Sequence, residues 1–348
     1  MSTSAKRIAI LGTRGIPNVY GGFEELAEHL AVYLAGKGHQ VVVYQTHNHP
    51  NKEMTYKGVV LERCYNAEVL LGTFGQFIYD FNCQWHARKQ HFDVWLHLGY
   101  TSNTIWSFLW PKKIKHVSNM DGLEWRRQKY APLVQRFLRW AEKQAVIHSD
   151  LHIADHPEMA RYLKDTYAID AAIIGYGATQ IAVEKPNIEL PESFDLVMAR
   201  MEPENHVDVI LASQLHVRRP LVVAGHISNR FAKLLIKQYP AGKKIYWLGG
   251  VYYKPHAEWL RQHCTYYIHG HSVGGTNPSL IQAMASGCRI IAHDNVFNRE
   301  ILSEDAVGYF QDAEYLGDLR RKQPTPPPTW TVPSWDSICR AYEKILFE

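Results

Sequence analysis

Short apolar runs alternate with amphipathic stretches along the chain, and this rhythm occurs twice. In the first half, strand patterns at Ile8–Gly12 and Val41–Tyr44 flank a helical stripe over Phe23–Gly36. In the second half, the same order begins again with a strand pattern at Phe194–Ala199 and a helical pattern at Val207–Leu215. Strands that alternate with helices favour parallel β-α-β units with right-handed crossovers. The sequence therefore predicts an α/β fold of two Rossmann-like, doubly wound parallel-sheet domains.

A proline-containing segment separates the two halves. At 348 residues the chain is too long for one ordinary core and suits two α/β domains. Pro186–Glu192 has two prolines and no periodicity, which is typical of a linker. A second break at Pro324–Pro328 precedes a helical pattern from Trp335 to Phe347. We expect an N-terminal domain over 1–185, a C-terminal domain over 193–328 and a helix over 329–348 that packs back on the first domain.

The first glycine-rich turn, GTRGIPNVYGG, follows a strand and opens a helix. Backbone N–H groups at such a position attract anions. The spacing differs from the Gly-x-Gly-x-x-Gly of dinucleotide sites, and Gln45 follows the second strand where an acidic residue would bind ribose. We interpret the turn as a loop that closes over a ligand through Gly21 and Gly22. An ordinary strand–helix turn without a ligand is the alternative.

The second glycine-rich turn, HGHSVGGTNPS, also joins a strand to a helix, with Pro278 at the favoured first helical position. Its glycines allow close backbone approach, and its hydroxyl and amide side chains add donors that suit a diphosphate. The predicted donor-binding residues of this turn are Gly274, Gly275, Thr276, Asn277 and Ser279. His269 and His271 have no carboxylate nearby and support a metal site only weakly.

Arg200 directly follows the first strand of the second domain. Ligands of doubly wound domains lie beyond the carboxyl ends of the strands. An arginine there can give a phosphate two charge-assisted hydrogen bonds. A solvated surface arginine is the alternative interpretation.

Four segments in order, GTRGIPNVYGGFE, DGLEWRR, RMEPEN and HSVGGTNPSL, resemble bacterial rhamnosyltransferases of glycosyltransferase family 4. The resemblance covers nearly the whole chain. It implies a retaining enzyme of the GT-B fold, in which two Rossmann-like domains face a cleft. The N-terminal domain would bind the acceptor and the C-terminal domain the nucleotide-sugar donor.

The resemblance assigns roles to several residues. Arg200 matches the arginine that contacts the donor diphosphate, whereas Asn205 replaces the usual lysine and removes a positive charge. Gly274 and Gln282 replace the two glutamates of a Glu-x7-Glu pattern, the second of which binds ribose. We hypothesise that Gln282 suits a deoxyribose, as in a dTDP-sugar, and loss of activity is the alternative. Glu300 resembles an acidic residue near the donor, although a helix-cap or surface role also fits.

Asp121 follows a strand in DGLEWRR and is the candidate for positioning or deprotonating the acceptor. A helix N-cap with Glu124 as its partner is the alternative, and both roles can coexist. The chain has no Asp-x-Asp triplet of the kind that holds a metal on a diphosphate. We therefore expect a metal-independent enzyme without cofactors, in which Arg200, backbone amides and helix N-termini neutralise the donor.

The stretch Trp106–Lys143 has nine basic against three acidic residues, with four tryptophans interleaved. This pattern suits an anionic membrane surface, with a solvated helix face as the alternative. No nucleic-acid module accompanies it. The resemblance implies an acceptor linked to a lipid diphosphate. The expected acceptor or membrane contacts are Arg14, Tyr20, Trp125, Arg126 and Arg127.

Five scattered cysteines without framework spacing predict reduced thiols. No apolar run reaches the roughly 20 residues that cross a bilayer, and the N-terminus has no signal-peptide pattern. We expect a cytoplasmic protein that can lie on the inner membrane surface. The predicted activity is transfer of L-rhamnose from dTDP-rhamnose to a bacterial surface glycan or lipid-linked saccharide. The alternatives are a UDP- or GDP-sugar-dependent transferase of the same fold and an inactive nucleotide- or glycan-binding relative.

Overall fold

The computed structural model describes residues 4–19, 21–120, 122–127 and 130–348. The chain forms two compact units. The first takes the chain up to Arg126, Tyr130–Tyr176 and Trp335–Glu348, and the second takes Gly177–Ser334 together with Arg127. The division at residue 177 lies earlier than the predicted linker, because the Glu184 N–H donates to the Pro255 carbonyl (3.3 Å) and so joins this segment to the second unit.

The first unit is built on an eight-stranded sheet in the order β3-β4-β2-β1-β5-β6-β7-β8. Its strands are β1 (Arg7–Leu11), β2 (Gln40–Thr46), β3 (Thr55–Tyr56), β4 (Val59–Cys64), β5 (Val94–Leu98), β6 (Lys115–Asn119), β7 (Leu151–Ala154) and β8 (Ala172–Ile173). All neighbours are parallel except β3 and β4. The strand order reverses between β1 and β5, which makes that point the topological switch of this sheet.

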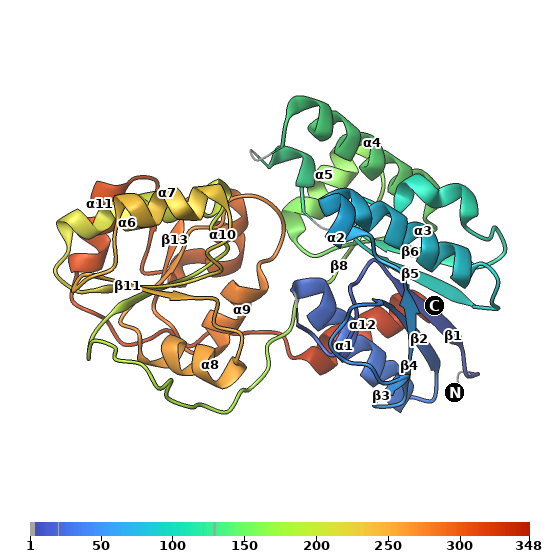
Figure 1. Cartoon of the computed structure of the whole chain (residues 1–348), viewed down its shortest axis with the longest axis horizontal. Coiled ribbons are helices and arrows are strands. Elements are labelled where there is room, and N and C mark those ends of the chain that lie inside the picture. Colours follow the sequence, from blue (N-terminus) through green and yellow to red (C-terminus); the bar gives the residue numbers. More distant parts are fainter. Residues whose placement is uncertain (1–3, 20, 121, 128–129) are drawn as a thin grey trace. The chain divides into compact units, whose positions relative to one another are not determined.

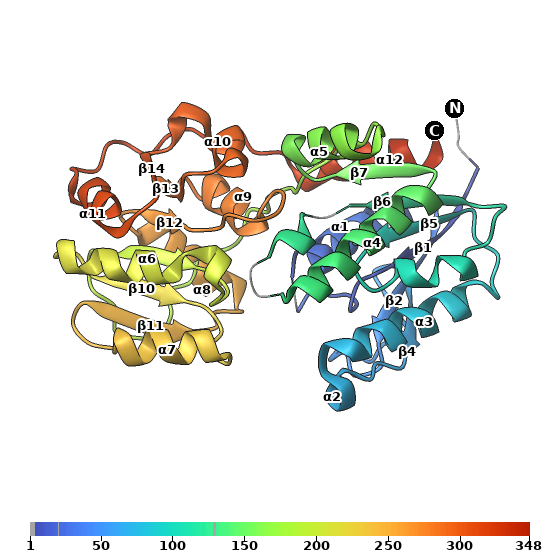
Figure 2. The ribbon, with the colours of Figure 1, turned by 90° about the horizontal axis from the view of Figure 1, so that it is seen from above.

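Helices cover both faces of this sheet (Figures 1 and 2). They are α1 (Gly22–Gly36), α2 (Glu68–Leu71), α3 (Gly75–Ala87), α4 (Pro132–His148), α5 (Pro157–Tyr167) and α12 (Trp335–Phe347), with short 3-10 turns η1 (Gly72–Phe74), η2 (Thr104–Leu109) and η3 (Glu124–Arg126). The C-terminal helix α12 packs on α1, where His29 stacks on Trp335 with ring centroids 4.4 Å apart. Tyr33 also donates its hydroxyl to Glu343 at 2.8 Å.

The second unit is built on a six-stranded, all-parallel sheet in the order β11-β10-β9-β12-β13-β14. The strands are β9 (Asp195–Met198), β10 (Leu221–Ala224), β11 (Ile245–Gly249), β12 (Tyr267–His269), β13 (Ile290–His293) and β14 (Gly308–Phe310). The strand order reverses between β9 and β12. The two predicted doubly wound domains are confirmed, with one antiparallel edge strand, β3, as the exception.

The helices of the second unit are α6 (Val207–Ala212), α7 (Arg230–Gln238), α8 (Lys254–His263), α9 (Pro278–Ala285), α10 (Val296–Leu302) and α11 (Ala313–Arg321), with turns η4 (Pro203–Asn205), η5 (Ser213–His216) and η6 (Ser303–Asp305). Apolar side chains of β9, β10 and β12 form its core with the inner faces of α6, α7 and α11. Because all strands of this sheet are parallel, the loops that follow them lie at the same edge of the sheet. The candidate site lies at this edge.

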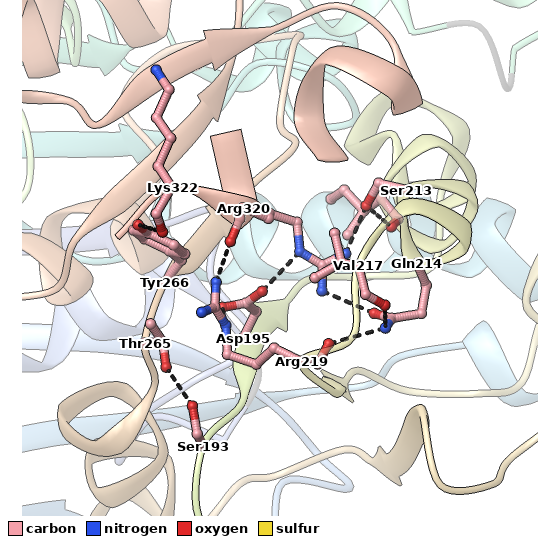
Figure 3. A network of polar contacts seen from close by, with 11 residues as sticks. Ser193, Asp195, Ser213, Gln214, Val217, Arg219, Thr265, Tyr266, Arg320 and Lys322 are labelled. Atoms are coloured by element: carbon pink, nitrogen blue, oxygen red, sulfur yellow. Dashed lines mark hydrogen bonds and ion pairs between the residues drawn. The ribbon is translucent and has the colours of Figure 1, made fainter. Parts of the chain in front are cut away.

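A buried ionic network anchors the opposite edge of this sheet (Figure 3). Asp195, the first residue of β9, accepts from Arg320 Nε at 2.8 Å and from Arg219 Nε at 2.7 Å. Arg320 also donates to the Ser213 hydroxyl (2.7 Å) and the Gln214 amide oxygen (2.9 Å). A buried arginine is tolerated because nearly all its donors are satisfied. The network fixes α11 and η5 against the base of β9, away from the loops at the strand ends.

All five cysteines are free, as predicted, and the structure buries each of them. In the described part of the chain, no helix combines the length and apolarity needed to cross a membrane.

Candidate functional site

The loops after β9 and β12 meet at the topological switch of the second unit. A Cβ on Gly270 would lie 2.0 Å from the Asn205 carbonyl oxygen, so only glycine permits this approach. The backbone N–H and the hydroxyl of Ser272 both donate to the Glu204 carbonyl at 3.0 Å. The two loops therefore form one connected surface at the strand ends.

Asn205 is buried and joins these loops through its side-chain amide. Its Nδ2 donates to the Arg200 carbonyl at 2.7 Å, and its Oδ1 accepts from Nδ1 of His271 at 2.8 Å. Since an amide oxygen cannot donate, the His271 proton lies on Nδ1 and Nε2 remains an acceptor. The Asn205 amide thus holds the Arg200 backbone and the His271 ring in place, and its predicted contact with the donor stays a prediction.

His271 and three further histidines, His206, His269 and His293, group around these two loops. His206 and His293 stack with ring centroids 3.8 Å apart, and His206 Nδ1 bonds the Gly270 carbonyl at 2.9 Å. Burial lowers the pKa of His269 to about 3 and that of His293 to about 4. Burial, assisted by neighbouring cationic groups, holds the pKa of His271 well below its usual value. These three imidazoles are neutral at pH 7, and a bound anion would favour their protonation.

Arg200 is exposed at the end of β9. No hydrogen bond or ion pair joins its guanidinium to any residue that the structure describes. An unpaired guanidinium beside the loops of a switch point can bind a phosphate with two charge-assisted hydrogen bonds. The predicted position of Arg200 beyond a strand end is therefore confirmed.

The turn after β12 leads into α9 as predicted, but two of its side chains serve the fold. Asn277 caps α9 by accepting from the Ser279 N–H at 2.9 Å, and the Ser279 hydroxyl bonds the Tyr267 hydroxyl at 2.7 Å. Gly274 has φ +102°, a conformation that favours glycine. Backbone groups of the Gly274–Gly275 segment are thus better placed to bind a phosphate than the side chains of Asn277 and Ser279. Thr276, between Gly275 and Asn277, is half-buried.

Gln282 bonds to another part of the same unit. Its Nε2 donates to the Thr179 carbonyl at 3.0 Å, and its Oε1 accepts from the Thr179 N–H at 3.4 Å. Nε2 also lies 3.3 Å from the buried carboxylate of Glu258. The side chain therefore fixes the segment around Thr179 to α9. Glu300 is exposed on α10, beyond β13.

In the first unit, the turn after β1 is folded around a carboxylate. Glu24, in the first turn of α1, accepts from the Arg14 N–H at 2.9 Å. The Arg14 guanidinium forms an ion pair with Glu68 at 2.6 Å. Gly21 and Gly22 start α1, and the Gly21 N–H donates to Asn18 Oδ1 at 3.2 Å. The turn thus holds an internal anion, which weakens its interpretation as an anion site for a ligand.

The predicted acceptor residues fall into three groups. Asp121 and Tyr20 lie outside the described residues. Arg126 lies over the Trp125 ring at 5.1 Å from its centroid, within the first unit. Arg127 groups with the second unit, where its Nη1 lies 3.3 Å from the buried carboxylate of Glu204.

Two buried carboxylates were missed by sequence reasoning. Asp80 on α3 accepts from the Ser102 hydroxyl at 2.5 Å, and burial raises its pKa to about 7. Glu142 on α4 accepts the hydroxyls of Tyr162 at 2.6 Å and Tyr167 at 2.7 Å. No motif marks either residue, because both depend on tertiary partners. Among the residues with described positions, no group of three or more His, Cys, Asp or Glu side chains could hold a metal ion.

Two family profiles match the chain. Residues 5–179 match the profile described as "Domain of unknown function (DUF1972)", and residues 179–319 match "Glycosyl transferases group 1". No curated protein matches the chain significantly.

Solved structures resemble the whole chain at low sequence identity. A sucrose-phosphate synthase from Thermosynechococcus elongatus is 15% identical with a TM-score of 0.72, covering 99% of this chain and 95% of its own. A glycosyltransferase from Rickettsia africae is 15% identical with a TM-score of 0.63, covering 99% and 98%. AviGT4, a glycosyltransferase of avilamycin A biosynthesis, is 14% identical with a TM-score of 0.53, covering 98% and 93%. Together with the two parallel-sheet units, these matches show the GT-B fold.

Proposed function

Since the chain belongs to the DUF1972 family and carries a group 1 glycosyltransferase domain on a GT-B fold, we propose that it transfers L-rhamnose from dTDP-rhamnose. A glycosyltransferase of this type uses a nucleotide-sugar donor and a glycan acceptor. The proposed acceptor is a bacterial surface glycan or a saccharide on a lipid diphosphate, reached at an anionic membrane surface from the cytoplasm.

The unpaired, exposed guanidinium of Arg200 at the β9–β12 switch is the observation that carries this proposal. It lies at the sheet edge where α9 begins and where Gly274 adopts its left-handed conformation. A diphosphate on this edge would receive charge from Arg200 and hydrogen bonds from backbone N–H groups. A bound anion would also raise the pKa values of the neighbouring buried histidines.

The proposed chemistry is transfer with retention of configuration. The bond between the sugar C1 and the diphosphate oxygen breaks, and its electron pair leaves with the diphosphate. The acceptor hydroxyl oxygen forms the new bond to C1 on the same face, and its proton passes to a phosphate oxygen of the leaving group or to a nearby base. Arg200 would stabilise the charge that develops on the diphosphate, and Asp121 is the proposed acceptor-positioning residue or base.

Two observations support a metal-independent dTDP donor. The chain has no Asp-x-Asp triplet, so Arg200 and backbone amides are the proposed counter-charges. The Gln282 amide is bonded to both backbone groups of Thr179 and offers no carboxylate for a pair of ribose hydroxyls. A deoxyribose lacks the 2′-hydroxyl, so it needs fewer hydrogen bonds from this position than a ribose does.

Calorimetric titration with dTDP, UDP and GDP, each with and without EDTA, tests the donor. We expect preferential binding of dTDP that EDTA does not change. Arg200→Ala should weaken it about 10- to 100-fold, because a hydrogen bond to a charged group contributes roughly 1.5–3 kcal/mol. Arg218→Ala, another exposed arginine at the opposite sheet edge, is the control. Preference for UDP or GDP would favour the related donors, and no binding at all would favour an inactive relative.

A further inference from the structure

The segment that leads into α3 exposes large apolar side chains. Val69 is 83% exposed, Leu70 75%, Leu71 52% and Phe74 75%, and α2 has no buried residue. Burying such side chains is favourable, and proteins rarely leave a contiguous group of them in water without a binding role. These exposed side chains therefore indicate a surface that binds a partner or a membrane.

Aromatic contacts connect this segment with α4. The Phe74 ring lies 6.2 Å from Phe77, and Phe77 lies 5.7 Å from Phe137, centroid to centroid. Phe137 in turn lies 5.7 Å from Trp140, which is exposed. Figures 1 and 2 show α2, α3 and α4 on the same side of the first unit, with α1 and α12 on the other. The name α2–α4 face denotes the exposed apolar surface formed by Val69, Leu70, Leu71, Phe74, Ile78, Leu133, Val134 and Trp140.

Cations flank this face, and its carboxylates are already engaged. Arg136, Arg139 and Lys143 are exposed on α4. Glu142, the only acidic residue of α4, is fully buried with its tyrosine partners. In α2 and α3, Glu68 is paired with Arg14 and Asp80 is buried. The described helices therefore present apolar and positively charged groups without an exposed, unpaired carboxylate.

We propose that the α2–α4 face docks on an anionic lipid bilayer. Apolar and aromatic side chains enter the headgroup–acyl boundary, while arginine and lysine beside them contact lipid phosphates. A second copy of the same face would bring like charges together, which disfavours self-association. The inference rests on the proposed function, because a lipid-linked acceptor has to be reached at the bilayer. It also adds α2 and Phe74 to the stretch Trp106–Lys143 that sequence analysis singled out.

Cosedimentation of the full chain with vesicles tests this docking. One set contains phosphatidylcholine alone, and the other contains phosphatidylcholine and phosphatidylglycerol in equal parts. We expect binding to the anionic set only, weakened by salt. Leu70→Ser with Phe74→Ser should lower the partition coefficient about tenfold or more, because both side chains would insert. Arg136→Gln with Lys143→Gln should remove the preference for anionic vesicles.

Leu215→Ser is the matched control, since Leu215 is 78% exposed on the second unit. It should bind vesicles like the unaltered chain. Equal binding by the Leu70→Ser/Phe74→Ser variant, or no binding by the unaltered chain, would overturn the proposal. Conversion of a dimer to a monomer by that variant, without vesicle binding, would overturn it in favour of a subunit interface. Titration of the same variants with dTDP keeps the tests separate, because vesicle binding without dTDP binding contradicts only the proposed donor.

Discussion

Oδ1 of Asn205 lies 2.8 Å from Nδ1 of His271, and this hydrogen bond ties the loop after β9 to the loop after β12. The same amide holds the Arg200 carbonyl at 2.7 Å. The position of the Arg200 backbone is thus set by a residue that itself faces inward. Asn205 is best described as a positioning residue for the proposed donor site.

Replacing Asn205 with alanine should release both loops. Two buried hydrogen bonds are lost and their partners are left unpaired, which we expect to cost about 1–3 kcal/mol of unfolding free energy. Affinity for dTDP should fall as well, because Arg200 is no longer held. Urea denaturation and calorimetry measure the two effects. An Asn205→Ala protein that binds dTDP as tightly as the unaltered chain would show that the contact is structural only.

Asp195→Asn should destabilise the second unit strongly. The change removes the charge shared by Arg320 and Arg219, and breaking a buried ion pair typically costs about 3–5 kcal/mol. Because the network lies at the opposite end of β9 from Arg200, dTDP affinity of the folded variant should be unchanged. Denaturant midpoints and titration at low temperature check both statements. A loss of affinity without a loss of stability would contradict the assignment of a purely structural role.

Stability should fall as the pH drops below about 6.5, the ordinary histidine value. His269, with a folded pKa of about 3, is neutral when folded but binds a proton when unfolded in the window between these values. Protons therefore favour unfolding there, by up to about 1.4 kcal/mol per pH unit for each such group. His269→Asn should show a shallower fall between pH 6.5 and 4. Thermal midpoints across that range measure the slopes, and parallel slopes would contradict the prediction.

The contribution of Asp80 to stability should change with pH in the opposite direction to that of His269. Its folded pKa of about 7 exceeds the ordinary carboxyl value, so its stabilising contribution is present at low pH and is lost as the pH rises through 7. Asp80→Asn removes this cost and should raise the unfolding free energy at pH 8 by on the order of 1 kcal/mol. Ser102 can still donate to the amide oxygen. Denaturant titration at pH 5 and pH 8 compares the two proteins, and a deficit at pH 8 would indicate a second role for the carboxylate.

The fold could be predicted from the sequence because the patterns that indicate it are local. Alternating apolar runs and helical stripes predicted both sheets, and Pro278 after Asn277 predicted the start of α9. Arg200 could be placed at a strand end because it directly follows a strand pattern in the sequence.

The remaining site features depend on partners far apart in the chain. Arg320 meets Asp195 across 125 residues, and Gln282 meets Thr179 across 103. A motif that assigns Gln282 to ribose does not reveal that its amide already has backbone partners. Buried groups such as Glu142 leave no pattern in the sequence, since only the fold brings Tyr162 and Tyr167 to them.

Release of dTDP from dTDP-rhamnose, followed by chromatography, tests the central claim most directly. Slow transfer to water requires no acceptor, so the unaltered chain alone should release dTDP, with EDTA present or absent. Arg200→Ala should lower the rate roughly 100-fold through lost stabilisation of the departing diphosphate, while Arg218→Ala keeps it. No release above the uncatalysed rate, even with a lipid-diphosphate-linked saccharide added, would contradict the assignment of this chain as a dTDP-rhamnose-dependent transferase.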